Sequence, residues 1–182
     1  LLVGGGMAFT FLAAQGRGVG NSLLEEDRID TAAALLKKAE DMGKALVLPT
    51  DVVVAEAVEE GAASKVVEID GIEPGWAGVD IGPQTVDEFS RKIARAMTIA
   101  WNGPLGVFEI PKFARGTFDV AQAVAARTDE GAISIIGGGD SAAAVVKAGL
   151  EQRVTHISTG GGASLRFLEG KPLPAIDALS DA

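Results

Sequence analysis

Three apolar segments of this chain each run directly into three consecutive glycines, at residues 4–6, 137–139 and 160–162. Glycine has no Cβ, so its backbone N–H groups can approach a ligand closely. The first N–H groups of a helix also lack partners within that helix. A strand that runs through bare glycines into a helix is therefore typical of a binding site for an anion such as phosphate.

The middle junction carries an acidic residue directly after its glycines, in the sequence Gly137-Gly138-Gly139-Asp140-Ser141. A carboxylate beside phosphate groups is repelled unless a divalent cation such as Mg²⁺ lies between them. This segment therefore predicts a magnesium-nucleotide site. The alternative interpretation is a flexible turn in which Asp140 is only the N-cap of the next helix.

A dinucleotide site is a second alternative for the middle junction. Gly137-x-Gly139-x-x-Ala142 satisfies the relaxed dinucleotide pattern. That pattern usually has an acidic partner about twenty positions later, at the end of the next strand, and residues 158–160 are Ser-Thr-Gly instead. A Walker-type loop is excluded, because none of the glycine clusters is followed by Lys and then Ser or Thr.

Strand patterns alternate with helix patterns along the chain. Helices are predicted at 7–14, 24–42, 86–96, 111–126 and 141–148, and strands at 1–3, 45–48, 65–69, 78–81, 97–101, 132–136 and 154–158. Hydrophobic residues make up 47% of the chain and aromatic residues 5%, which suits buried parallel strands. We expect an α/β fold, a three-layer α/β/α Rossmann-like domain with a mainly parallel sheet and with ligand loops at the carboxyl ends of its strands.

Charge and composition exclude several classes of partner. The formal net charge is −9 and Lys and Arg do not cluster, so no nucleic acid partner is expected. Cysteine is absent and His156 is the only histidine, which excludes disulfides, thiolate metal sites and multi-histidine metal sites. No segment approaches ~20 consecutive apolar residues, so we expect no membrane partner and a cytoplasmic location.

Six segments together resemble the carboxyl-terminal, nucleotide-binding half of phosphoglycerate kinase. In chain order they are GGGMAFTF at 4–11, LPTD at 48–51, DIGP at 80–83, WNGPLGVFE at 101–109, GGGDSA at 137–142 and STGGGAS at 158–164. The resemblance covers essentially the whole chain. It implies a glycolytic phosphotransferase that moves a phosphoryl group reversibly between 1,3-bisphosphoglycerate and ADP, giving 3-phosphoglycerate and ATP.

The resemblance also implies a role for each motif at bound Mg-ADP or Mg-ATP. Gly5 and Gly6 would approach the adenine, with Leu23 and Val79 near its faces, and Glu109 would hold the ribose. The phosphates would meet Asn102, Gly138, Gly139, Asp140 and Ser141, with Asp140 also serving the Mg²⁺. The catalytic positions would be Gly160, Gly161 and Gly162, whose N–H groups would stabilise the charge of the transferred group.

The first residue, Leu1, lies inside an apolar run without a polar lead-in. We therefore expect residues 1–182 to be a nucleotide-binding domain whose first strand lies upstream. The resemblance implies an upstream domain that binds 3-phosphoglycerate or 1,3-bisphosphoglycerate, and an intact protein that is a monomer. The isolated chain is then expected to bind ADP or ATP weakly and to be inactive. The alternative is a non-catalytic nucleotide- or dinucleotide-binding Rossmann-like module.

Overall fold

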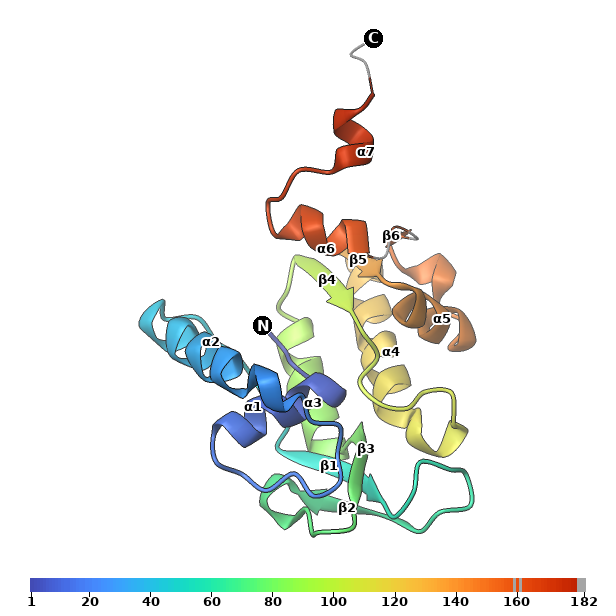
Figure 1. Cartoon of the computed structure of the whole chain (residues 1–182). Helices are drawn as coiled ribbons and strands as arrows, with labels where there is room; N and C mark the ends of the chain where they lie inside the picture. The colour runs from blue at the N-terminus through green and yellow to red at the C-terminus, as the bar shows by residue number, and fades with distance from the viewer. Residues whose placement is uncertain (159, 161, 180–182) are drawn as a thin grey trace.

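A computed structural model describes residues 1–158, 160 and 162–179 (Figure 1). Its helices are α1 (Gly6–Ala14), α2 (Ile29–Asp41), α3 (Pro83–Ile93), α4 (Arg115–Asp129), α5 (Gly139–Lys147), α6 (Gly162–Leu168) and α7 (Pro174–Asp177). Its strands are β1 (Asp51–Ala55), β2 (Ser64–Glu68), β3 (Ala77–Ile81), β4 (Thr98–Asn102), β5 (Ile133–Gly137) and β6 (His156–Ser158). Short 3-10 helices lie at Glu26–Arg28, Ile69–Gly71, Pro111–Phe113 and Glu151–Arg153.

The strands β4, β5 and β6 form a parallel sheet in that order. Its register pairs Asn102 with Gly137 and Gly137 with Ser158, so the carboxyl ends of the three strands lie side by side. A further parallel bridge joins Leu2 to Val47, within two segments predicted as strands. The predicted parallel strands are confirmed, and the second and third glycine junctions meet at one edge of this sheet.

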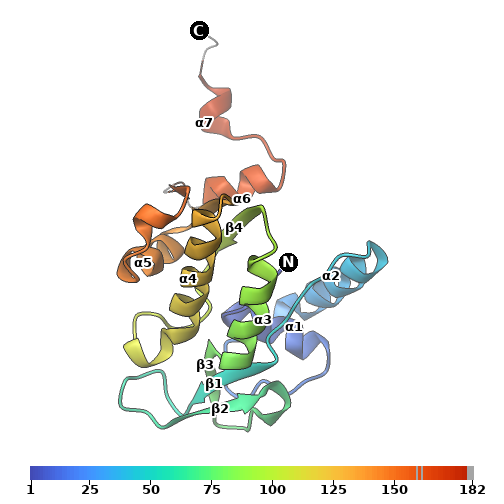
Figure 2. The same cartoon turned by 180° about the vertical axis from the view of Figure 1, so that it is seen from behind.

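Helices pack on opposite sides of the strand segments at 1–3 and 45–48. Leu2 and Val47 pack against a core cluster built largely from α3 and α4. The alternating residues Val3, Leu46 and Leu48 instead pack with α1 and α2. Both views of the chain show α3 beside α4 and α1 beside α2 (Figures 1 and 2). These layers confirm the predicted α/β, Rossmann-like fold class.

A second, antiparallel sheet was not predicted. Its order is β2-β1-β3, and β1 pairs antiparallel with both neighbours. The strands predicted at 65–69 and 78–81 correspond to β2 and β3, whereas β1 was missed. Its first residue, Asp51, follows Pro49-Thr50 and so resembles a turn residue, yet Asp51 is fully buried.

Two buried aspartates of this sheet bind the first turns of the helices packed on it. Helices α3 and α4 begin after Gly82 and Ala114, neither of which supplies a side-chain cap. Asp51 of β1 accepts hydrogen bonds from the N–H groups at the start of α3, and Asp80 of β3 accepts one at 2.6 Å from Gly116 N of α4. The N–H groups that a helix leaves unpaired are thus satisfied from a neighbouring strand.

Helix boundaries differ from prediction by a few residues where short 3-10 turns intervene. The helix predicted from Leu24 begins at Ile29, after the 3-10 turn Glu26–Arg28. Pro111 begins a 3-10 turn, and α4 follows it at Arg115. None of the helices in the described ranges is long and apolar enough to span a bilayer.

Candidate functional site

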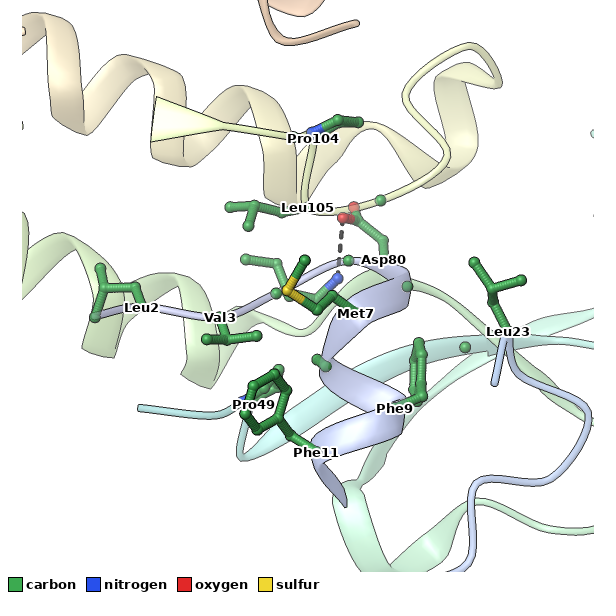
Figure 3. A pocket seen from close by; sticks show the side chains of 18 of the residues that line it. Leu2, Val3, Met7, Phe9, Phe11, Leu23, Pro49, Asp80, Pro104 and Leu105 are labelled. Carbon is green, nitrogen blue, oxygen red and sulfur yellow. Dashed lines mark hydrogen bonds between the residues drawn. The ribbon is translucent and has the colours of Figure 1, made fainter. Parts of the chain in front are cut away.

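A large, mostly apolar cavity of about 960 Å³ lies between the start of α1, the strand β3 and the loop that follows β4. Five of the predicted nucleotide residues line it, namely Gly5, Gly6, Leu23, Val79 and Asn102. Figure 3 shows Leu23, Phe9, Leu105 and Pro104 around it, with Asp80 on its wall. Its lining, as far as the structure describes it, contains no Lys, Arg or His.

The two glycines at the start of α1 are in close contact with two different residues of the cavity lining. A Cβ on Gly5 would lie 2.6 Å from the carbonyl oxygen of Pro104, and the φ of Gly5 is +63°. A Cβ on Gly6 would lie 2.6 Å from Leu23 Cδ2. A side chain at either position would therefore push the loop after β4, or Leu23, away from α1.

The two predicted apolar contacts of the adenine differ in exposure. Leu23 is 69% exposed, so its side chain is available to a ligand. Val79 is 2% exposed and packs with Phe113, while its backbone oxygen accepts a hydrogen bond from Val107 N at 2.8 Å. Leu23 therefore presents an exposed apolar side chain at the cavity, and Val79 belongs to a buried part of its wall.

The loop after β4 is held by its neighbours along its length. Leu105 N donates to Thr117 Oγ1 at 3.0 Å, and Val107 N donates to Val79 O at 2.8 Å. Phe108 is buried against Ala114 and Ala144. A loop fixed in this way can present side chains to a ligand without a large ordering cost on binding.

Asn102 lies at the carboxyl end of β4, next to the second glycine junction. A Cβ on Gly138 would lie 3.2 Å from Asn102 Nδ2, and a Cβ on Gly137 would lie 3.3 Å from the same atom. Gly138 has φ +90°, a conformation that favours glycine. The Asn102 amide and the backbone of residues 137–138 therefore occupy one small region at the end of the sheet.

The two polar residues at the start of α5, Asp140 and Ser141, differ in exposure and in hydrogen bonding. Gly138 is the N-cap, and no side chain caps this helix, so the alternative interpretation of Asp140 as the N-cap is wrong. Asp140 is exposed in the first turn. Ser141 is 1% exposed, and its Oγ accepts a hydrogen bond of 2.6 Å from Gly103 N, so its oxygen binds the loop after β4.

Asp140 fits a magnesium site only if the nucleotide supplies most of the ligands. In the ranges that the structure describes, no group of three or more His, Cys, Asp and Glu residues could hold a metal ion. Mg²⁺ in proteins is commonly held by one or two carboxylates together with substrate phosphates and water. A single exposed carboxylate beside the unpaired N–H groups of a helix start is compatible with that arrangement.

Glu109 and residues 138–141 lie outside the lining of the large cavity. Glu109 is exposed on the loop after β4, and its backbone oxygen accepts a hydrogen bond from Lys147 Nζ at 3.2 Å. The same ammonium donates to Phe108 O at 2.9 Å. Sequence reasoning missed Lys147, whose partners lie 38 and 39 residues earlier in the chain.

The third glycine junction lies beside the second. Gly160 N donates to Ser158 Oγ at 3.3 Å, and the hydroxyls of Ser158 and Ser164 are 2.6 Å apart. Gly162 is the first residue of α6, whereas Gly161 lies outside the described residues. Gly160 and Gly162 are therefore near the same sheet edge as Asn102 and Gly137, through the pairing of β5 with β6.

Asp80 is a second residue that sequence reasoning did not single out as part of the site. Burial raises the pKa of its carboxyl from 3.8 to about 7, although hydrogen bonds from Gly116 N and Ile81 N act in the opposite direction. A nearby charge on Asp119 adds to the rise. Asp80 lines the cavity, and a Cβ on Gly106 would lie 2.2 Å from its Oδ1. The Asp80 carboxyl is thus in close contact with the backbone of the loop after β4.

Comparison with known proteins gives one consistent result. A family model described as phosphoglycerate kinase matches residues 1–171. A phosphoglycerate kinase from Chlorobaculum tepidum is 59% identical over 181 residues, covering all of this chain and 46% of the relative. One from Chloroherpeton thalassium is 56% identical over 182 residues, with the same coverage.

Solved structures agree with the sequence relatives. The structure of phosphoglycerate kinase from Coxiella burnetii superposes with a TM-score of 0.92 at 47% identity, covering 97% of this chain and 45% of that chain. Phosphoglycerate kinase from Pyrococcus horikoshii gives a TM-score of 0.80 at 32% identity, covering 98% and 44%. This chain spans less than half the length of the relatives and structures it matches.

Proposed function

Because this chain belongs to the phosphoglycerate kinase family, we propose that it is the nucleotide-binding domain of a glycolytic phosphotransferase. The reaction is the reversible transfer of a phosphoryl group from 1,3-bisphosphoglycerate to ADP, giving 3-phosphoglycerate and ATP. The intact protein is proposed to be a monomer that works in the cytoplasm.

One observation supports this proposal most directly. The carboxyl ends of β4, β5 and β6 lie side by side, and that of β4 adjoins an apolar cavity of about 960 Å³. A nucleotide has an apolar, flat base at one end and a row of charged phosphates at the other. An apolar cavity next to a glycine-rich helix start has the chemistry that such a ligand requires.

The adenine is proposed to enter the cavity between Leu23 and Val79, above Gly5 and Gly6. The exposed carboxylate of Glu109 would accept hydrogen bonds from the ribose hydroxyls. The phosphates would meet Asn102, Gly138, Gly139 and Ser141. The Ser141 Oγ already accepts a hydrogen bond from Gly103 N. Asp140 would hold the Mg²⁺, which when bound neutralises phosphate charge.

The N–H groups of Gly160, Gly161 and Gly162 are proposed to stabilise the transferred group. Backbone donors fixed in advance stabilise developing charge without having to reorganise during the reaction. The cavity lining described here carries no cationic side chain, and phosphoryl transfer needs positive charge. This chain covers 46% of its relatives. We therefore propose that the cationic side chains lie in the part of the intact protein that corresponds to the rest of those relatives.

We also propose that residues 1–182 form one domain whose sheet is completed by an upstream strand. The cavity is bounded by residues 1–3 on one side and by Ala100 and Trp101 of β4 on the other. On the side away from the cavity, Leu2 pairs with Val47. Likewise, β4 pairs with β5 on its side away from the cavity. A strand inserted in this part of the cavity would find a partner on each side, and it would leave the part lined by Gly5, Gly6, Leu23 and Val79 to the adenine. An upstream domain would bring 3-phosphoglycerate.

Calorimetric titration of ADP into the folded chain, with and without Mg²⁺, tests the nucleotide site. We expect Mg²⁺ to strengthen binding to the wild-type chain and to have much less effect on Asp140→Ala. Asp30→Ala is the matched control, because Asp30 is also an exposed residue in the first turn of a helix. Absence of ADP binding by a folded chain would contradict the proposal, and preferential binding of NAD would favour the dinucleotide alternative.

A further inference from the structure

Helix α5 holds the loop after β4 at both of its ends. At the start of the helix, Ser141 Oγ accepts a hydrogen bond from Gly103 N at 2.6 Å. At its end, Lys147 Nζ donates to Phe108 O at 2.9 Å and to Glu109 O at 3.2 Å. Between them, Ala144 packs against the buried Phe108. These three residues of α5 are spaced by three, so they share one face of the helix.

Further interactions hold the Lys147 ammonium in place. Its ammonium lies 5.9 Å from the centroid of the Phe108 ring. It also lies in the last turn of α5, where a positive charge interacts favourably with the helix dipole. In the described part of the chain, this ammonium binds two backbone carbonyls rather than a carboxylate. Hydrogen bonds from an ionised donor are stronger than those between neutral groups.

The two ends of α5 therefore meet two different parts of the proposed nucleotide site. The start of the helix carries residues 138–141, proposed to meet the phosphates, and its end fixes the backbone of Glu109, proposed to hold the ribose. One helix thus connects the loop's two ends through Ser141 and Lys147.

We propose that Lys147 is a positioning residue that orients Glu109 toward the ribose of the bound nucleotide. This inference rests on the function proposed above. Lys147 does not touch the ligand itself. Its ammonium fixes the carbonyls of Phe108 and Glu109, and so sets the direction in which the Glu109 side chain leaves the loop. Without that charge, the end of the loop can rotate while Phe108 stays packed.

A comparison of two ligands isolates this role. ADP has both ribose hydroxyls, and 2′,3′-dideoxy-ADP has neither, so only ADP can use Glu109. Lys147→Met keeps an apolar side chain of similar length but removes the ammonium. We expect Lys147→Met to weaken ADP binding about tenfold, within the range of coupling between residues of one network, and to leave dideoxy-ADP binding nearly unchanged.

A double-mutant cycle gives the second readout. In a Glu109→Gln background, Lys147→Met should cause little further loss of ADP affinity, because the contact it orients is already weakened. Lys147→Arg can still donate to both carbonyls and should restore the preference for ADP over dideoxy-ADP. Lys92→Met is the matched control, since Lys92 also lies in the last turn of a helix and is exposed; it should bind both ligands as the wild type does.

Several outcomes would overturn the positioning role. Equal weakening of ADP and dideoxy-ADP by Lys147→Met, or additive losses in the double mutant, would mean that Lys147 only stabilises the fold. If Lys147→Met does not fold, Lys147→Gln removes the charge while keeping a donor, and the same two ligands are compared. Failure of the wild-type chain to bind ADP would instead overturn the proposed function, which separates the two failures.

Discussion

Asp51 and Thr85 bind each other reciprocally, although they are 34 residues apart in the sequence. Asp51 Oδ1 accepts hydrogen bonds of 2.7 Å from both Thr85 N and Thr85 Oγ1. In return, Thr85 Oγ1 accepts one of 3.1 Å from Asp51 N. Both residues are fully buried. The strand β1 thereby acts as the N-terminal cap of α3.

Asp51→Ala should lower the free energy of unfolding by about 3 kcal/mol, because it removes a cap and leaves buried donors unpaired. Urea denaturation measures this change. Asp30→Ala, in the exposed first turn of α2, should change the free energy of unfolding by no more than about 0.5 kcal/mol. Equal effects of the two substitutions would argue against the cap.

Gly82→Ala should be destabilising for a steric reason alone. A Cβ on Gly82 would lie 2.2 Å from the Asp51 Cγ, although the φ of Gly82 is an ordinary −82°. The carboxylate cannot move aside without breaking the cap, so we expect a loss of about 2 kcal/mol in the free energy of unfolding. Gly61→Ala, where nothing lies within 4 Å, is the control and should have almost no effect in the same denaturation experiment.

The buried carboxyl of Asp80 should make stability depend on pH. Its pKa is raised from 3.8 to about 7, so between these values the folded protein retains a proton that the unfolded chain has lost. The stabilisation is complete below the unfolded pKa and is lost as pH rises through the folded pKa. We expect the wild-type free energy of unfolding to fall between pH 4 and 7 more steeply than that of Asp80→Asn, measured by urea denaturation across this range. Parallel pH profiles would contradict this assignment.

Gly5→Ala should weaken ADP binding in addition to destabilising the fold. Gly5 has φ +63° and a Cβ there would meet Pro104 O at 2.6 Å, whereas Gly16 has φ +78° with nothing within 4 Å. Gly16→Ala should lose about 1 kcal/mol of stability through backbone strain. Gly5→Ala should lose more, because its Cβ also meets a backbone oxygen. Only Gly5→Ala should also weaken ADP binding in calorimetric titration, because it displaces the loop after β4. Unchanged affinity in Gly5→Ala would argue against an adenine site at this glycine.

The parts of the fold that follow from local patterns were predictable from the sequence. The helix predicted at 7–14 is observed at Gly6–Ala14, and the strand predicted at 132–136 is observed at Ile133–Gly137. In each case glycines flank a run of apolar residues, so the run that forms the element and the glycines that bound it lie within a few residues of each other. The glycine junctions and the parallel direction of the strands β4, β5 and β6 therefore followed from the chain alone.

The parts that depend on distant partners were not predictable in this way. A buried strand is usually recognised by its apolar residues, and Asp51 is an acidic residue in such a strand. Its burial is stable because the start of α3 supplies hydrogen bonds to its carboxylate. Lys147 has the pattern of a solvated helix residue, and its carbonyl partners become neighbours only in the folded chain. Neither position has a local signal that could have revealed its role.

The two aspartate caps also bear on the order in which the chain folds. The first turns of α3 and α4 receive their hydrogen bonds from residues 34 and 36 positions earlier, and closing such loops costs entropy before any contact repays it. Helix initiation is the costly step for an isolated helix. Completion of α3 and α4 should therefore coincide with pairing of β1 and β3 in the folding transition state, and substitutions at Asp51 and Asp80 should slow folding more than they accelerate unfolding.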